Sequence, residues 1–146
     1  MDVEPIRWAK RPAIFRIFLL FQIPSAFFSG IKIRQLDEDE CIVSVPFKWF
    51  TRNPFRSTYF ACLGMAAEMS TGALCLASIQ RKKASVSMLV THVETHYFKK
   101  AIGTTFFSCK EGLQIDEVIE RVISENKPLT VTAHSIGHNK AGEIVA

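Results

Sequence analysis

Glu68 is the residue of this chain with the clearest capacity for chemistry. It is the only charged side chain in the apolar stretch of residues 58–80. An ionised carboxylate in such surroundings needs a partner or water, and groups of this kind gather at functional sites. Glu68 can therefore accept a proton from a water molecule that attacks a carbonyl group, or attack the carbonyl itself. The alternative interpretation is a structural ion pair or a hydrogen-bonded carboxylate at an interface.

The start of the same stretch supplies polar groups that can face a reacting carbonyl. If a helix begins there, the backbone N–H groups of Phe60 and Ala61 lie in its first turn, unpaired within the helix and at the positive end of its dipole. Such donors stabilise the oxyanion of a tetrahedral intermediate, although every helix start has them. Asn53 is a candidate for orienting the water or the carbonyl, and Tyr59 for donating a phenolic hydrogen bond. The alternatives are a turn residue before proline for Asn53 and a cover over the helix end for Tyr59.

Basic residues bracket the segment that follows: Arg81, Lys82, Lys83, Lys99 and Lys100. Clusters of Lys and Arg are natural partners of phosphate groups, so these five are candidate substrate-binding residues. The alternative is a solvated basic rim. No glycine-rich phosphate loop, no Ser-His-Asp pattern and no aromatic-basic signature accompanies them. We therefore expect no nucleic-acid partner.

His92, Glu94 and His96 alternate, so a strand would place all three on one face. Two His and one Glu are a known zinc ligand set, but no neighbouring segment supplies a further ligand, and we favour a solvated or interface face. The four cysteines contain no Cys-x-x-Cys pair and resemble buried free thiols: Cys41, Cys62, Cys75 and Cys109. We expect no metal, no cofactor and a reducing, cytoplasmic compartment.

The composition fits one domain with a well-filled core. The 146 residues are 48% hydrophobic and 22% charged, with 12 Phe. These values exclude a disordered chain and suggest a large apolar core or cavity. The formal net charge of +4 suits an anionic ligand, a membrane surface or a nucleic acid equally and does not decide among them.

Two apolar stretches need an interpretation. Residues 13–28 follow basic residues, as in a signal peptide, but Arg16 interrupts them and they are too short to span a bilayer. We expect a packing helix, with peripheral membrane contact as the second interpretation and a cleaved signal as the third. Residues 58–80 are long enough to span a membrane, but Glu68 would then lie at the bilayer centre. We favour a buried helix of a soluble domain.

The hydropathy pattern predicts strands around this helix. They cover residues 31–34, 41–47, 86–98, 102–109 and 129–136, with an amphipathic helix at 115–123 and a turn at 139–142. One long buried helix among antiparallel strands is an α+β plan in which the sheet wraps the helix.

This plan and three local motifs resemble the hotdog fold of the acyl-CoA thioesterase superfamily. In the phenylacetyl-CoA-thioesterase-like group, an Asn lies six residues before the His of a His-Gly-Gly turn, and a helical Asp or Glu lies nine after it. Asn53, Tyr59 and Glu68 have this spacing, with Tyr59, Phe60 and Ala61 in place of His-Gly-Gly. Residues 97–103 (YFKKAIG) resemble the family's joint between two long strands, and residues 139–146 (NKAGEIVA) resemble its closing turn and strand.

The resemblance is greatest to an uncharacterised thioesterase-like branch, and it implies the following expectations. Residues 1–29 form an N-terminal helical extension and residues 30–146 form the hotdog domain. The protein forms a homodimer, with a tetramer as the larger alternative, because hotdog sheets pair edge to edge and form their pockets at the subunit interface. The function is hydrolysis of an acyl-CoA-like thioester with Glu68 as base or nucleophile. The alternatives are an acyl- or lipid-binding protein without catalysis and a purely structural dimer.

Overall fold

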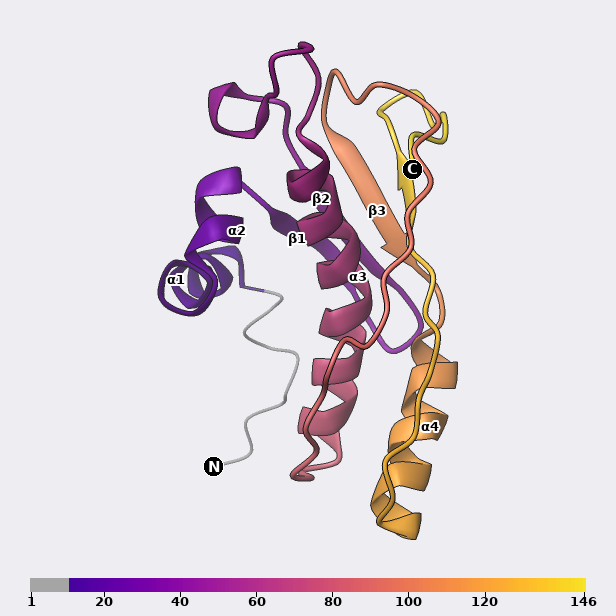
Figure 1. Cartoon of the computed structure of the whole chain (residues 1–146). Helices are drawn as coiled ribbons and strands as arrows, with labels where there is room; N and C mark the ends of the chain where they lie inside the picture. The colour runs from indigo at the N-terminus through magenta and orange to yellow at the C-terminus, as the bar shows by residue number, and fades with distance from the viewer. Residues whose placement is uncertain (1–10) are drawn as a thin grey trace.

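The computed structural model describes residues 11–146 (Figure 1). In chain order the elements are α1 (Pro12–Gln22), α2 (Pro24–Ser29), β1 (Lys32–Leu36), β2 (Cys41–Val45), the 3-10 helix η1 (Trp49–Thr51), α3 (Phe60–Arg81), β3 (Thr105–Cys109), α4 (Gly112–Glu125) and β4 (Ile136–His138). The long helix α3 lies against one face of the sheet (Figure 1). The predicted α+β class is confirmed.

The sheet is antiparallel throughout, in the order β1-β2-β3-β4. Val43 of β2 is the partner of Phe107 of β3, and both side chains are buried. In β3 the buried residues alternate with half-buried ones, as expected for a strand with one face on the core. The sheet therefore buries one apolar face against α3.

Helix α3 begins two residues later than predicted and has no side-chain cap. Its N-cap is Tyr59, not Ser57 or Thr58. The Thr58 hydroxyl donates instead to the carbonyl of Ala101 at 3.1 Å, and the Ser57 hydroxyl lies 3.1 Å from the Asn53 amide nitrogen. Both candidate caps are therefore used to hold the loop that precedes the helix.

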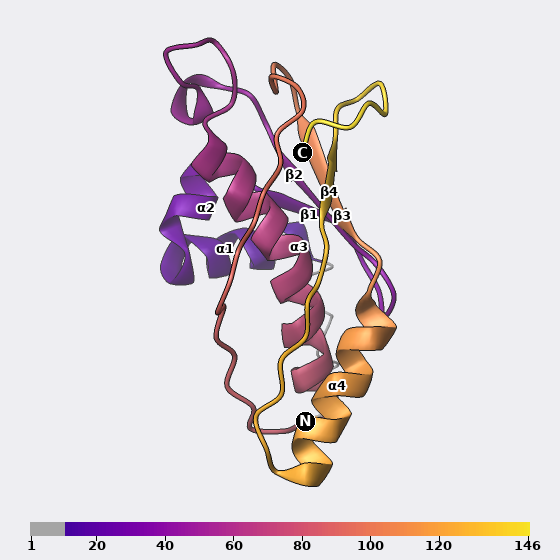
Figure 2. The same cartoon turned by 45° about the vertical axis from the view of Figure 1, so that its right-hand side comes forward.

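The predicted strand of residues 86–98 does not form, and of the predicted strand of residues 129–136 only Ile136 lies in a strand, as the first residue of β4. The first segment runs beside α3 in both views, the second passes between α3 and α4 in Figure 2, and residues 87–98 are exposed. Among the described residues, the backbone hydrogen bonds of the first segment are those of Phe98 and Lys99 to the carbonyl of Val145. The alternating pattern holds these residues extended, but a ladder also requires a neighbouring strand, and residues 11–146 of one copy do not supply it.

Helices α1 and α2 pack on the same core. Phe15 and Leu19 of α1 and Ala26 of α2 are buried and belong to the main apolar cluster. The two helices are separated at Ile23, before Pro24, and α2 ends at Gly30 in the left-handed conformation. A packing helix was predicted here, and the structure has two.

Among the described helices, α3 is the one with the length and apolarity needed to cross a membrane. A core helix of a globular domain passes the same test. Here α3 contacts β2, β3 and α4, and Leu63, Ala66 and Leu74 are buried. In this structure it is the central helix of the core, as predicted, and of its residues only Phe60 and Glu68 are exposed.

Candidate functional site at the start of the central helix

A cavity of about 640 Å³ opens at the N-terminal end of α3. Its wall combines the loop before α3, the first turn of α3 and the joint before β3. The lining residues are Asn53, Pro54, Phe55, Ser57, Thr58, Tyr59, Phe60, Leu63, Tyr97, Phe98, Lys99, Lys100 and Ala101. Five of the ten residues predicted from sequence for the site lie here: Asn53, Tyr59, Phe60, Lys99 and Lys100.

The Asn53 side chain shapes the loop that forms one wall. Its carbonyl oxygen accepts hydrogen bonds from the backbone N–H of Phe55 at 2.9 Å and of Ser57 at 3.2 Å. The backbone N–H of Tyr59 donates to the carbonyl of Thr51 at 2.7 Å, which fixes where α3 begins. In this state the Asn53 amide is committed to its own loop, as in an Asx-turn.

The first turn of α3 keeps two free donors. The backbone N–H groups of Phe60 and Ala61 make no hydrogen bond to any described residue. The aromatic rings of Tyr59 and Phe60 contact each other edge to face at 4.9 Å, and they are 46% and 58% exposed. The cavity therefore combines aromatic walls with a positive helix end, which suits an apolar group that carries a carbonyl.

The two lysines of the cavity have different surroundings. The Lys99 ammonium forms an ion pair with Glu143 at 2.5 Å, next to the closing turn. The Lys100 ammonium donates to the carbonyl of Phe55 at 3.4 Å, a weak contact. Lys100 is consequently the cation of this cavity that is more easily recruited by an anionic ligand.

Glu68 lies two turns further along α3, on its exposed side. Its carboxylate forms no hydrogen bond or ion pair with any residue between 11 and 146, and partial burial raises its pKa. The side chain lies over Gly72, where an added Cβ would meet Oε1 at 3.0 Å. The absence of a partner argues against the structural ion pair within one chain. Glu68 is less buried than expected from its place in the apolar stretch.

Glu68 and the helix-start donors are separated in one copy of the chain. Glu68 is the eighth residue after Phe60, which corresponds to about 12 Å along the helix axis. Hydrogen-bond reach is about 3 Å. These groups therefore do not meet on one carbonyl within a single copy.

Arg81, Lys82 and Lys83 lie at the opposite end of α3, a helix about 33 Å long. The Asp116 carboxylate of α4 accepts contacts from Arg81 at 2.5 Å, Lys82 at 3.0 Å and the Ser78 hydroxyl at 2.5 Å. Burial acts to raise the pKa of Asp116, but hydrogen bonds from Ser78, Lys82 and Arg81 outweigh it and lower that pKa. Arg81 and Lys82 thus tie α3 to α4, and the structure does not bring them to the cavity.

His92, Glu94 and His96 lie on the exposed extended segment. The Glu94 carboxylate is 3.0 Å from the His96 ring nitrogen and 3.9 Å from that of His92. Within residues 11–146 no group of three His, Cys, Asp or Glu side chains has a geometry that could hold a metal ion.

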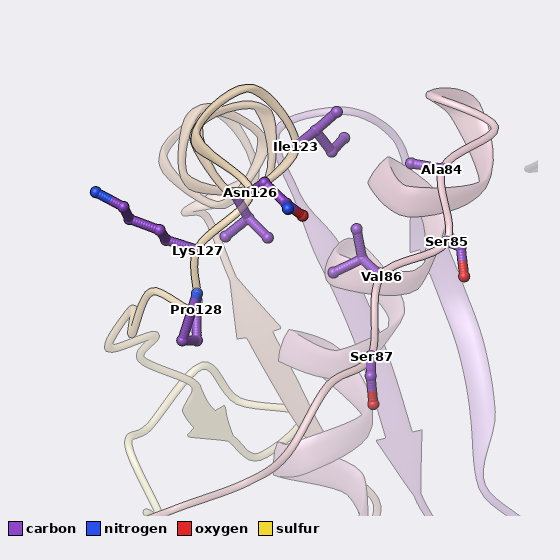
Figure 3. Close-up of a pocket in the computed structure, with 9 residues that line it drawn as sticks. Ala84, Ser85, Val86, Ser87, Ile123, Asn126, Lys127 and Pro128 are labelled. Atoms are coloured by element: carbon purple, nitrogen blue, oxygen red, sulfur yellow. The ribbon is translucent and has the colours of Figure 1, made fainter.

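A second cavity of about 510 Å³ lies between the segment after α3 and the end of α4 (Figure 3). Val86 and Ile123 face it from either side, and Lys127 points away from them (Figure 3). Its lining contains two serines but no acid, His or Cys to activate them, so we assign no chemistry to it.

Sequence reasoning missed the aromatic residues that complete the first cavity. Phe55, Tyr97 and Phe98 line it, and they are exposed. The signal was available, since Tyr97 and Phe98 directly precede the two candidate lysines. Only the fold places this joint beside the start of α3, through the Thr58 contact with Ala101.

Solved structures with the same fold include thioesterases. A protein of unknown function from Chlorobaculum tepidum aligns with a TM-score of 0.77 at 17% identity, over 93% of this chain and 82% of that one. A protein from Pseudomonas aeruginosa, PA5026, described as a probable thioesterase, aligns with a TM-score of 0.74 at 18% identity, over 92% and 89%. The PaaI protein of the Escherichia coli phenylacetic acid degradation operon aligns with a TM-score of 0.61 at 12% identity, over 97% and 88%. The predicted hotdog fold is confirmed.

No curated protein matches the sequence significantly. Residues 11–146 match a family described as a domain of unknown function, DUF4442. This match agrees with the predicted resemblance to an uncharacterised branch of the thioesterase-like proteins, and it covers every residue that the structure describes. The chain therefore belongs to the DUF4442 family and has the hotdog fold.

Proposed function

We propose that the protein hydrolyses an acyl thioester, with an acyl-CoA as the substrate and Glu68 as the general base. The observation that carries the proposal is Glu68 itself. It is the only acid on α3, it has no partner among the described residues, and partial burial raises its pKa. A carboxylate with these properties on the central helix of a thioesterase-like fold is suited to accept a proton at neutral pH.

The proposed step uses water as the nucleophile. Glu68 takes a proton from the water while the water oxygen forms a bond to the thioester carbonyl carbon. The N–H groups of Phe60 and Ala61 donate to the resulting oxyanion. When the tetrahedral intermediate collapses, the carbon–sulfur bond breaks and the thiolate leaves with the proton returned by Glu68. The products are a carboxylic acid and a free thiol.

This step requires two copies of the chain. Glu68 and the helix-start donors lie about 12 Å apart along one helix, so one thioester can contact both only if they come from different copies. The exposed edge of residues 86–98 supports a homodimer, because an unpaired extended segment is a template for another strand. The four free cysteines support a reducing, cytoplasmic location.

The test is a panel of acyl-CoA substrates of increasing chain length, with release of free thiol as the readout. The protein's own cysteines require a blank without substrate, since Cys75 is only half-buried. We expect turnover of at least one substrate. Absence of turnover across the panel, with the protein folded and dimeric, would contradict the proposal.

A second candidate is binding of an acyl chain or lipid without catalysis. The exposed rings of Tyr59 and Phe60 favour it, because they occupy the positions at which the resemblance places a His and the first Gly of the His-Gly-Gly turn. Ligand-induced thermal stabilisation without turnover would support this candidate. A structural dimer would show neither.

A further inference from the structure

An exposed apolar surface covers the side of the molecule formed by α1, α2 and η1, which lie together in both views (Figures 1 and 2). We name it the aromatic face and define it by Phe21, Ile23, Phe28, Trp49 and Phe50, all exposed. Phe21 and Trp49 are each 76% exposed. Contiguous apolar surfaces of this kind mark interaction sites.

The aromatic face is continuous between the elements. The Phe28 ring of α2 lies 6.0 Å from the Phe50 ring of η1, and Phe50 lies 6.5 Å from Trp49. Helix α1 packs on α2 and presents Ile14 and Ile17 to solvent. Trp and Phe beside a short helix with basic neighbours are typical of segments that lie in the interface of a bilayer.

The charge of this region has one sign. Residues 11–36 and 46–67 contain seven of the 18 Lys and Arg and none of the 14 Asp and Glu. Arg11, Lys48, Arg52 and Arg56 are exposed. Eight of the 14 acids lie in the turn of residues 37–40 and on α4. The region is thus positive although the whole chain carries only +4.

We propose that the aromatic face docks on the surface of an anionic lipid bilayer. Apolar rings enter the acyl boundary while the surrounding Lys and Arg contact lipid phosphates. A second copy of the chain fits this surface less well, since a two-fold contact would place basic residues against the same basic residues. The proposal does not depend on thioester hydrolysis. It does place the cavity beside the membrane, because Asn53 follows Arg52 directly in the chain.

The experiment uses the full chain and vesicles of phosphatidylcholine, with or without phosphatidylglycerol, separated by flotation. We expect binding to be at least tenfold stronger with the anionic lipid and to weaken with salt. The chain has 2 Trp, so a Trp8→Phe background isolates the emission of Trp49. That emission is expected to shift to shorter wavelength on anionic vesicles.

Variants separate the contribution of the aromatic rings to vesicle binding from that of the basic side chains. Trp49→Ser with Phe50→Ser is expected to lower vesicle binding at least tenfold. Lys48→Gln with Arg52→Gln is expected to lower it about fivefold for each charge removed. The matched control is Leu113→Ser with Ile123→Ser, which removes two exposed apolar residues from α4 and leaves binding unchanged. Thermal midpoints confirm that each variant is folded.

Three outcomes would overturn the proposal. Equal binding to neutral and anionic vesicles would remove the role of charge. An unchanged Trp49 emission on bound vesicles would place the contact elsewhere. A change of oligomeric state in the Trp49 and Phe50 variant, without loss of vesicle binding, would make the aromatic face an interface between two copies.

Discussion

At the scale of single residues, the raised pKa of Glu68 has a consequence for both stability and rate. Burial raises the pKa above 4.5, so ionising Glu68 disfavours the folded state relative to the unfolded one. The stability contributed by this group is complete at acidic pH and is lost as the pH rises through the folded-state pKa. At neutral pH the ionised Glu68 therefore costs folding free energy, as expected for the base of the proposed reaction.

Glu68→Gln is expected to separate the effect of Glu68 on the rate of hydrolysis from its effect on stability. The amide keeps the volume but cannot accept the proton, so hydrolysis should fall by about 10²–10⁴-fold. The thermal midpoint should stay level or rise, because the variant no longer buries part of a charge. Rate and midpoint are measured on one preparation, with Glu117→Gln on α4 as the control that changes neither. A destabilised Glu68→Gln variant with full specific activity would show that Glu68 is structural.

At the scale of elements, the contact between α3 and α4 depends on Asp116. Three donors, from Ser78, Arg81 and Lys82, converge on its carboxylate. Hydrogen bonds to charged groups contribute about 1.5–3 kcal/mol to stability. Because the pKa of Asp116 is lowered from 3.8, its contribution is complete above that value and is lost as the pH falls through the folded-state pKa.

Asp116→Asn should therefore lower the free energy of unfolding by about 1.5–3 kcal/mol at neutral pH. The difference from the original chain should shrink as the pH falls below 3.8. Denaturant unfolding at several pH values measures both effects. The control is Arg121→Gln, which breaks an exposed pair with Glu125 and should change stability by less than about 0.5 kcal/mol. A pH-independent loss would assign the effect to packing instead of charge.

The start of α4 requires a glycine for contact with the turn between β1 and β2. A Cβ added at Gly112 would lie 1.9 Å from the carbonyl oxygen of Glu38, a backbone atom that cannot move alone. Gly112→Ala should lower stability by about 1–3 kcal/mol or more. Gly64→Ala in α3 meets nothing within 4 Å and should raise stability by about 0.5–1 kcal/mol. Thermal unfolding compares the two, and equal midpoints would contradict the close approach at Gly112.

Whether a helix or strand could be predicted from the sequence depends on whether it needs a neighbouring element that lies far away in the chain. The hairpin of β1 and β2, the helix α3 and the stripe of Ile115 and Ile119 on α4 were predictable because each is specified by local periodicity. Residues 86–98 have an equally good strand pattern, but a strand also needs a distant neighbour that local pattern does not specify. The residues that line the first cavity were likewise predictable only where local sequence specifies their element. Tyr59 and Phe60 were found from their helix, whereas Phe55 and Phe98 reach the site only through the fold.

The basic residues predicted to bind substrate lie in two distant places, for a related reason. Arg81 and Lys82 were grouped with Lys99 and Lys100 because both pairs flank one segment of chain. The structure places the first pair at the far end of α3, held by Asp116, and the second pair beside the helix start. The segment between them, residues 83–98, runs back along α3, so its two ends lie near opposite ends of that helix (Figures 1 and 2).

At the scale of the whole molecule, the described part of the chain has two exposed surfaces that could bind a partner, and they differ in chemical character. The aromatic face is apolar and basic, whereas the segment 86–98 is an exposed backbone edge. Hydrogen bonding along a strand edge does not require an apolar surface, so this edge suits a second copy of the chain. Pairing there would also bring a second copy close to α3, because this segment runs beside that helix (Figure 2).

Proline substitutions test the edge of residues 86–98 without removing a hydrogen bond within a single copy of the chain. Val93 is 71% exposed, and neither its backbone N–H nor that of Glu94 donates to a described residue. Successive N–H groups of an extended segment point to opposite edges, so one of Val93→Pro and Glu94→Pro removes a donor that faces the second copy. That variant should weaken the dimer at least tenfold while the thermal midpoint of the monomer changes little, because no bond within one copy is lost. Sedimentation velocity over a range of concentrations measures the dimer, with Val93→Thr and Glu94→Gln as controls that keep both N–H groups. If both proline variants dimerise as tightly as the original chain, the subunit contact lies elsewhere, and Glu68 of one copy and the helix start of another have no edge to bring them together.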